Sequence, residues 1–135
     1  MAIFSRLSRY QNTGLLIMRL GIGAMMVGHG YPKLIGGPQT WSRLGSALAT
    51  FGMHDFPTFW GFMAAFAEGV GGLLFLIGFF FRPASLLLLL TMIVAAAKHL
   101  GAGDGIMGSS HAIELGVLFL AMFIIGPGRY SIDKS

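Results

Sequence analysis

Four long apolar runs, separated by clusters of glycine, proline and charged residues, set the pattern of the sequence. They cover residues 14–31, 59–81, 84–100 and 109–125, and each is 17 to 23 residues long. About 20 apolar helical residues, each rising about 1.5 Å, cross the hydrocarbon core of a bilayer. The pattern therefore predicts an all-α membrane protein whose single domain, residues 1–135, is a bundle of four transmembrane helices.

Helix breakers mark the ends of these runs. Pro32 and the Gly36-Gly37-Pro38 cluster are expected to end the first, because proline lacks a backbone donor and glycine favours turns. The Arg82-Pro83 pair is expected to end the second, with Pro83 in the first turn of the next helix. Spans two and three then form a hairpin with a very short turn.

A shorter helical pattern lies between the first two runs. Within residues 38–57, the apolar residues Trp41, Leu44, Leu48 and Phe51 recur at helical spacing. A short interfacial helix is therefore expected here, either lying on the membrane or capping the bundle.

The composition identifies lipid as the solvent of these helices. Hydrophobic residues make up 55% of the chain and charged residues 10%, whereas soluble domains carry about 25% charged residues. A soluble monomer is therefore excluded. Without cysteine, the chain has no disulfide, thiolate metal site or iron–sulfur cluster. The net charge of +4 comes from singly scattered basic residues, so no nucleic-acid partner is expected.

Basic residues outside the runs indicate orientation. Residues 1–13 lack the continuous apolar stretch and cleavage site of a signal peptide, and four crossings place both termini on one side. That side carries Arg6, Arg9, Arg82, Arg129 and Lys134, and the other carries Lys33, Arg43 and Lys98. The positive-inside rule then predicts that both termini lie in the cytoplasm.

Three segments resemble the DoxX family of small bacterial membrane proteins. They are His-Gly-Tyr-Pro-Lys-Leu at 29–34 after the Arg-Leu-Gly of 19–21, Ala-Glu-Gly-Val-Gly-Gly-Leu-Leu at 67–74, and Gly-Pro-Gly-Arg-Tyr-Ser-Ile-Asp at 126–133. Arg82 and the Ala-Leu-rich run after it also fit, so the resemblance covers nearly the whole chain. It implies a four-helix fold in the bacterial inner membrane. The family takes its name from a quinone-reducing, sulfur-oxidising system.

Three ionisable residues, Arg19, Glu68 and Glu114, lie inside the apolar runs. A charge near the centre of a membrane helix costs about 2.5–3.5 kcal/mol by insertion scales, so each needs a partner or a function. Arg19 and Glu68 are expected at similar depth and are predicted to pair. Such a pair can also be purely structural, joining two helices without a further role.

Ionisable residues also gather in one layer near the outer ends of the spans. His111 and Glu114 are three residues apart, hence on one helical face, and His29 and His99 are expected at the same level. Reduction of a quinone needs hydrogen-bond donors to two oxygens and a route for protons, which imidazoles and a carboxylate can supply. These four residues are therefore the candidates for quinone hydrogen bonds or a proton relay.

Tyr31, Trp60 and Lys98 lie at a similar depth, where the two rings can stack on a quinone and the amine can contact it. The alternative for each polar member of this layer is an interfacial side chain reaching to water. Metal and haem are not predicted, because the chain has neither His-x-x-x-His nor Glu-x-x-His, and His54 beside Asp55 is expected to be a solvated pair. A glycine-rich phosphate loop is also missing, so no nucleotide is expected.

Small residues at Gly61, Ala65, Gly69 and Gly72 form a stripe along which another helix can approach closely. Three functions remain open. The first is a quinone-linked subunit of a membrane oxidoreductase system, with a peripheral or membrane redox enzyme as partner. The second is a non-catalytic anchor or assembly partner for a peripheral enzyme, and the third is a small transporter using Glu68. A homo-oligomer within the lipid bilayer is compatible with each.

Overall fold

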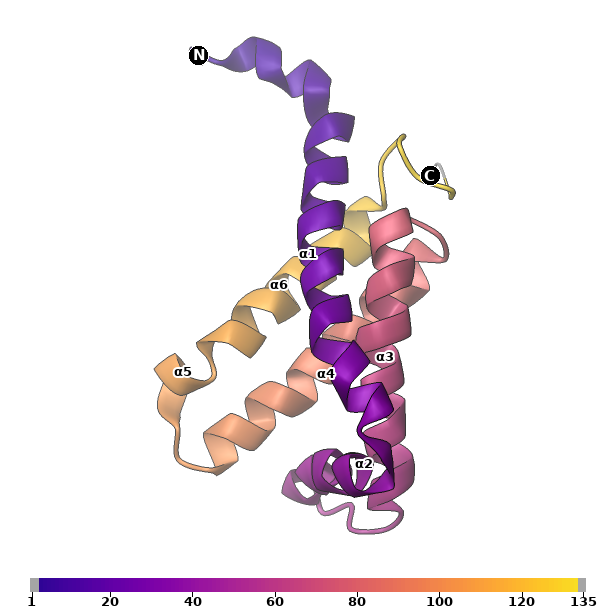
Figure 1. The fold of residues 1–135 in the computed structure, drawn as a ribbon. Helices are drawn as coiled ribbons and strands as arrows, with labels where there is room; N and C mark the ends of the chain where they lie inside the picture. The colour runs from indigo at the N-terminus through magenta and orange to yellow at the C-terminus, as the bar shows by residue number, and fades with distance from the viewer. Residues whose placement is uncertain (1–2, 134–135) are drawn as a thin grey trace.

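The computed structural model describes residues 3–133, and within that range the chain forms helices and loops without a strand. An all-α protein is therefore confirmed (Figure 1). In chain order the helices are η1 (Ser5–Tyr10), α1 (Gln11–Ile35), α2 (Gly37–Gly45), η2 (Ser46–Phe51), α3 (Pro57–Ile77), α4 (Phe81–Gly101), α5 (Gly105–Gly108) and α6 (Ser110–Ile125).

Three helical segments in the described range are long and apolar enough to cross a membrane: η1 with α1, α3, and α4. They correspond to the first three predicted spans. The fourth predicted span, α6, is apolar but has 16 residues. At about 1.5 Å per residue it reaches about 24 Å, short of a hydrocarbon core of about 30 Å.

The long helices form two pairs (Figure 1). α1 packs along α3, and α4 packs along α6, while α3 also contacts α4. The α4–α6 pair is inclined to the α1–α3 pair, and both termini lie at the end of the molecule that carries the α3–α4 turn. At the other end, α2 and η2 pack against α3. The predicted helix between the first two spans therefore forms and caps the bundle.

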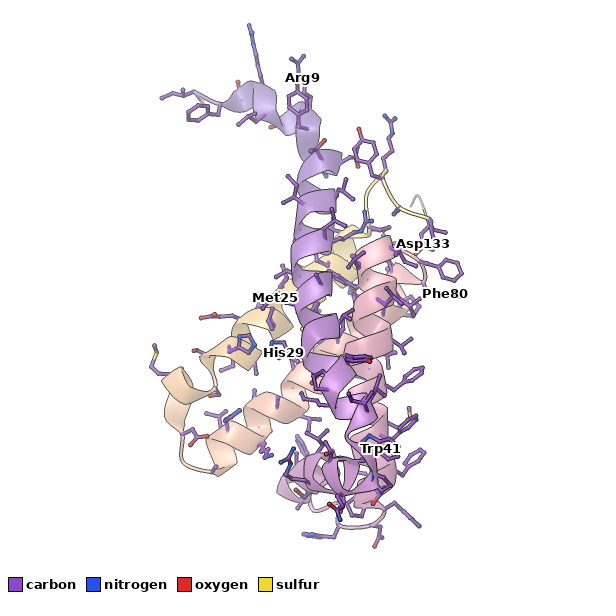
Figure 2. All side chains as sticks on the ribbon, viewed as in Figure 1. Arg9, Met25, His29, Trp41, Phe80 and Asp133 are labelled. Carbon is purple, nitrogen blue, oxygen red and sulfur yellow. The ribbon has the colours of Figure 1, made fainter. Side chains whose placement is uncertain are left out.

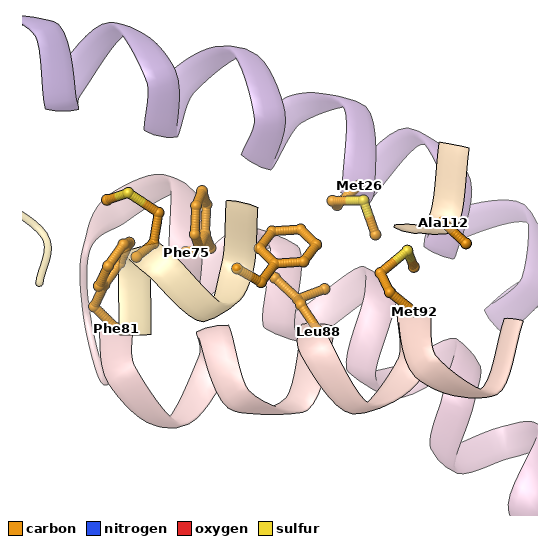
Figure 3. Close-up of a cluster of buried hydrophobic side chains, with 8 residues drawn as sticks. Met26, Phe75, Phe81, Leu88, Met92 and Ala112 are labelled. Atoms are coloured by element: carbon orange, nitrogen blue, oxygen red, sulfur yellow. The ribbon is translucent and has the colours of Figure 1, made fainter. Parts of the chain in front are cut away.

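A cluster of buried apolar side chains joins the two pairs (Figure 3). Phe75 of α3 stacks on Phe81 of α4, with ring centroids 4.7 Å apart, and meets Phe119 of α6 edge-on at 5.4 Å. Such aromatic contacts add to the dispersion energy of a packed interior. The buried members are Met26, Phe75, Phe81, Leu88, Met92, Ala112, Phe119 and Met122.

Glycines bring the backbones of α1 and α3 into contact. A Cβ added at Gly30 would overlap the backbone nitrogen of Gly69, and one at Gly72 would lie 2.9 Å from the Cβ of Met26. The small-residue stripe on α3 is buried as predicted, although Gly61 faces the carbonyl of Trp41 on α2 rather than α1. Small residues permit this approach in lipid, where helices associate mainly by close packing.

Pro32 does not end the first helix, contrary to the prediction. α1 continues through it to Ile35 and ends where Gly37 takes a left-handed conformation, with φ of 80°. A proline inside a helix crowds the carbonyl four residues earlier. That residue is Gly28, so the helix loses the hydrogen bond to the Gly28 carbonyl at Pro32 and still continues for three more residues.

The hairpin turn also lies earlier than predicted, at residues 78–80 rather than at Arg82-Pro83. Gly78 has φ of 73°, and the amides of Gly78 and Phe79 both donate to the carbonyl of Leu74, at 2.9 and 3.0 Å. Glycine adopts this left-handed cap without steric cost, which explains why α3 stops here. Pro83 lies in the first turn of α4, as expected.

The start of α4 is capped from the far end of the chain. The Asp133 carboxylate accepts hydrogen bonds from the amides of Phe80 and Phe81, at 3.1 and 2.7 Å, and lies beside Phe80 in Figure 2. A carboxylate at a helix N-terminus satisfies free amides and complements the helix dipole. The aspartate that closes the 126–133 segment therefore has a structural role.

We predict that Gly30→Ala lowers the stability of the bundle, because the added methyl group would force α1 and α3 apart. The expected cost is about 1–3 kcal/mol, measured as a lower thermal midpoint in detergent. Gly28→Ala is the matched control on the same helix, since a Cβ there meets open space. An equal midpoint for the two variants would contradict the close contact.

Candidate functional site

A polar pocket of about 190 Å³ lies between the α1–α3 pair and the α4–α6 pair. Residues of α1, α3, α4, α5 and α6 line it, so it depends on the arrangement of both helix pairs. Among the lining residues, the ionisable ones are His29, Lys33, Glu68, His99 and His111.

Helical periodicity places these side chains on the pocket. On α1 the lining residues are Met26, His29 and Lys33, and on α4 positions 92, 95 and 99 repeat the same spacing. Residues three or four apart share one helical face. Each of these helices therefore presents an apolar residue, Met26 or Met92, and a polar residue further along the same face.

An ion pair between Lys33 and Glu68 forms the deepest polar part of the pocket. The Lys33 ammonium donates to both carboxylate oxygens, at 2.8 and 3.0 Å, and the Glu68 side chain is 8% exposed against 32% for Lys33. The indole Nε1 of Trp41 donates to the backbone carbonyl of Lys33 at 3.0 Å, which ties α2 to this turn of α1. Each charge thus neutralises the desolvation cost of the other.

His99 lies in a second charged contact, nearer the pocket opening. Its Nδ1 lies 2.8 Å from a carboxylate oxygen of Asp104, and both side chains are about half exposed. A carboxylate on one imidazole nitrogen orients the ring. The other nitrogen, Nε2, then remains for a ligand or for proton exchange.

His29 and His111 face each other across the pocket. Their ring centroids are 6.0 Å apart, so these side chains connect α1, where Figure 2 labels His29, with α6. Both residues are exposed. With His99, they bring three imidazoles to one cavity.

A larger, apolar pocket of about 480 Å³ adjoins the polar one. It lies between α3 and α4 under α2 and η2, and Trp60 and Lys98 line it. The two pockets share Lys33, Glu68 and His99, together with Ala95. The ion pair and His99 therefore stand at the boundary between a polar compartment and an apolar one.

The structure brings together some of the predicted site residues and separates others. His29, His99 and His111 share the polar pocket, whereas Trp60 and Lys98 line the apolar one. Glu114 is exposed and does not line the pocket. Viewed down α6, Ala112 and Leu115, which line the pocket, lie to one side of His111, and Glu114 lies to the other side. Tyr31 is 61% exposed and lines neither pocket.

The predicted pair between Arg19 and Glu68 is wrong. Gly30 lies level with Gly69, and Arg19 is eleven residues, about 16 Å of helix, before Gly30. Arg19 therefore lies at the end of α3, beyond reach of Glu68. The partner that Glu68 has instead is Lys33.

Arg19 is 2% exposed and bound by backbone carbonyls. Its guanidinium donates to the carbonyls of Pro127, Tyr130 and Leu76, at 3.2, 2.8 and 3.0 Å. The rigid fork of an arginine suits several acceptors at once. Arg19 thus joins α1, the end of α3 and the 126–133 segment.

Two members of the site, Lys33 and Asp104, were missed by sequence reasoning. Lys33 was placed outside the first span because Pro32 was expected to end the helix, although its four-residue spacing from His29 is a sign of a shared face. Asp104 follows His99 by five residues, in a connection with no helical period to place it. His54 and Asp55, expected as a solvated pair, are both exposed in the loop before α3.

Metal chemistry finds no geometric support in the described residues. Between residues 3 and 133 no three histidine, cysteine, aspartate or glutamate side chains are grouped so that they could hold an ion. The arrangement can instead donate hydrogen bonds, hold charge and exchange protons. A cation and three imidazoles provide donors, and the two carboxylates orient two of them.

The sequence matches the model of a known protein family. The model of the family described as DoxX matches residues 14–100, more than half of the chain. That range covers α2 and α3 and nearly all of α1 and α4, and it includes Lys33, Glu68 and His99. Comparison with curated proteins and with solved structures gives no significant match.

We predict that Lys33 and Glu68 are energetically coupled and that Arg19 and Glu68 are not. In a double-mutant cycle with Lys33→Met and Glu68→Gln, the coupling free energy should be about 1–3 kcal/mol, since Lys33→Met leaves the buried Glu68 carboxylate unpaired and Glu68→Gln leaves the half-buried ammonium unpaired. Arg19→Lys combined with Glu68→Gln serves as the control and should be additive within about 0.5 kcal/mol. Denaturation in detergent measures both cycles, and coupling found only in the second would refute the assignment.

Proposed function

This chain belongs to the DoxX family, and we propose that its polar pocket binds the head group of a membrane quinone as a subunit of a membrane oxidoreductase system. The observation that carries this proposal is the position of the Lys33–Glu68 pair and His99 between a polar and an apolar pocket. A quinone has the same division, with two carbonyl oxygens on a ring and a hydrocarbon tail.

The donor set fits the two oxygens of a quinone. The Lys33 ammonium and the imidazoles of His29, His99 and His111 donate hydrogen bonds, and hydrogen bonds from charged donors are the stronger kind. Glu68 holds the ammonium in place and balances its charge. The quinone supplies the two-electron chemistry when bound.

The residues of this chain contribute protons and position. His99 and Asp104 are half exposed at the pocket opening, so the imidazole can exchange protons with water while one nitrogen is held. The chain contains no cysteine, and electrons come from a partner redox enzyme. The role of the pocket is then to bind, orient and protonate.

We further propose that α6 crosses the bilayer with α1, α3 and α4, and that both termini lie in the cytoplasm of a bacterial inner membrane. The termini share one end of the molecule, where Arg9, Arg82 and Arg129 also lie. A membrane thins or flanking residues adapt around a short span at modest cost. The basic end then follows the positive-inside rule.

Menadione, a naphthoquinone without a tail, tests the head-group site. We expect it to quench tryptophan fluorescence of the purified protein saturably, because Trp60 lines the adjoining pocket. His99→Ala and His111→Ala should each weaken binding about fivefold, the value of one hydrogen bond.

Glu114→Gln is the matched control for this experiment, since Glu114 is an ionisable residue of α6 outside the pocket. Its dissociation constant should equal that of the unmodified protein. Equal binding by the two histidine variants and by the control would disprove the head-group site.

Reporter fusions test the topology. A fluorescent protein fused after Ser135 should fold and fluoresce in the cytoplasm, whereas alkaline phosphatase at the same position should be inactive. Fusion of each reporter into the 102–104 connection between α4 and α5 should give the reverse result. Cytoplasmic signals at both positions would overturn four crossings.

A further inference from the structure

We propose that the apolar pocket under α2 and η2 holds the hydrocarbon tail of the same ligand, so that the protein has room for quinones with a long tail. This inference rests on the proposed function, because it assumes that the head group lies in the polar pocket. It adds a second binding site with its own residues, which the binding of the head group alone would not require.

The apolar pocket is built by several segments, unlike the lipid-facing side of a single helix. Leu48 of η2 covers one end, Trp60 and Met63 of α3 form one wall, and Leu90 and Val94 of α4 form the other. At about 480 Å³ it has more than twice the volume of the polar pocket. An extended hydrocarbon chain suits a cavity of this kind.

The chemistry of the walls is that of a hydrocarbon site. Thr91, a polar residue of α4 in the wall, donates its hydroxyl hydrogen to the carbonyl of Leu87 at 2.9 Å, so this donor does not need a ligand as its partner. Charged side chains contribute where the pocket meets the polar one, at Lys33 and Glu68, and at Lys98 near the end of α4. A polar ligand would leave its own groups unpaired here.

The apolar pocket is open where α3 and α4 face the surroundings of the bundle. Met63, Leu87 and Leu90 are each more than a third exposed although they line it. In a bilayer this opening faces hydrocarbon, because α3 and α4 are both long and apolar enough to span it. A tail already dissolved in the membrane can therefore enter sideways while its head group reaches the ion pair.

Continuity with the polar pocket identifies the occupant. Lys33, Glu68 and His99 line both cavities, so a ligand in one touches residues of the other. An acyl chain of an ordinary bilayer lipid would fill the apolar pocket without regard to the polar one. A quinone would occupy both pockets, with its head group in one and its tail in the other. Quinones with and without a tail therefore distinguish a quinone tail from a lipid acyl chain as the occupant of the apolar pocket.

The tail should need an open cavity but add little to the binding free energy. Moving a hydrocarbon from lipid into an apolar pocket gains little, because both surroundings are apolar. Filling the pocket with protein atoms, however, leaves a tail no room and displaces the head group attached to it. The apolar pocket is therefore needed for a quinone with a tail to bind, and a quinone without a tail does not depend on it.

Menadione and menaquinone-4 test this, because they share the same naphthoquinone head group and only menaquinone-4 has a tail. Ala64→Phe and Val94→Phe place a ring in the apolar pocket, and Ala24→Phe, at an exposed position of α1 outside both pockets, is the matched control. In nanodiscs of defined lipid, we expect both pocket variants to weaken menaquinone-4 binding about tenfold. Menadione binding should stay within about twofold, which also reports that each variant is folded.

A photoreactive group at the end of the menaquinone tail tests the unmodified protein. Peptides of α2 and η2, residues 37–51, should carry the label, and excess menaquinone-4 should prevent labelling. If menadione binds but the variants affect both quinones equally, or if the label falls elsewhere, the tail site is overturned and the head-group site stands. If neither quinone binds the unmodified protein, the proposed function fails with it.

Discussion

The backbone contact between α1 and α3 at Gly30 and Gly69 is the constraint on which the rest of the structure depends. With no side chain between them, the two helices meet at one register and cannot slide without steric overlap. That register places Lys33 beside Glu68 and puts Arg19 at the end of α3. Glu68 and Arg19, two of the three ionisable residues in the apolar runs, therefore have separate partners, one an ammonium and the other a set of backbone carbonyls.

Each of these partnerships serves a different part of the molecule. Arg19 and Asp133 fasten the segment after α6 to the α3–α4 turn, so that the end with both termini is tightly closed. Towards the other end, α4 and α6 lean away from α1 and α3, and the pockets lie where the pairs diverge. Charged residues thus hold the helices and the 126–133 segment together at one end, whereas those at the other end line the pockets, where a ligand can contact them.

The site illustrates how far periodicity reaches. His29, His99 and His111 were predicted to converge from their level in the spans, and they do share a pocket. Glu114 was predicted to join them because it lies three residues after His111. That spacing shows that the two residues share a face of α6, but it does not show which edge of this face borders the pocket. Lys33 was expected outside the first span because Pro32 was expected to end the helix, whereas α1 continues through Pro32 to Ile35.

The sequence by itself determined the helices, their apolar solvent, the small-residue stripe and the membership of a family of membrane proteins. These follow from composition and from the period of the α-helix, which are local properties. Only the tertiary structure decided that Glu68 pairs with Lys33, that Arg19 binds carbonyls, and that Asp133 caps α4. Each of these partners is distant in sequence, and distance between helices depends on their register, which steric contact sets after the helices have formed.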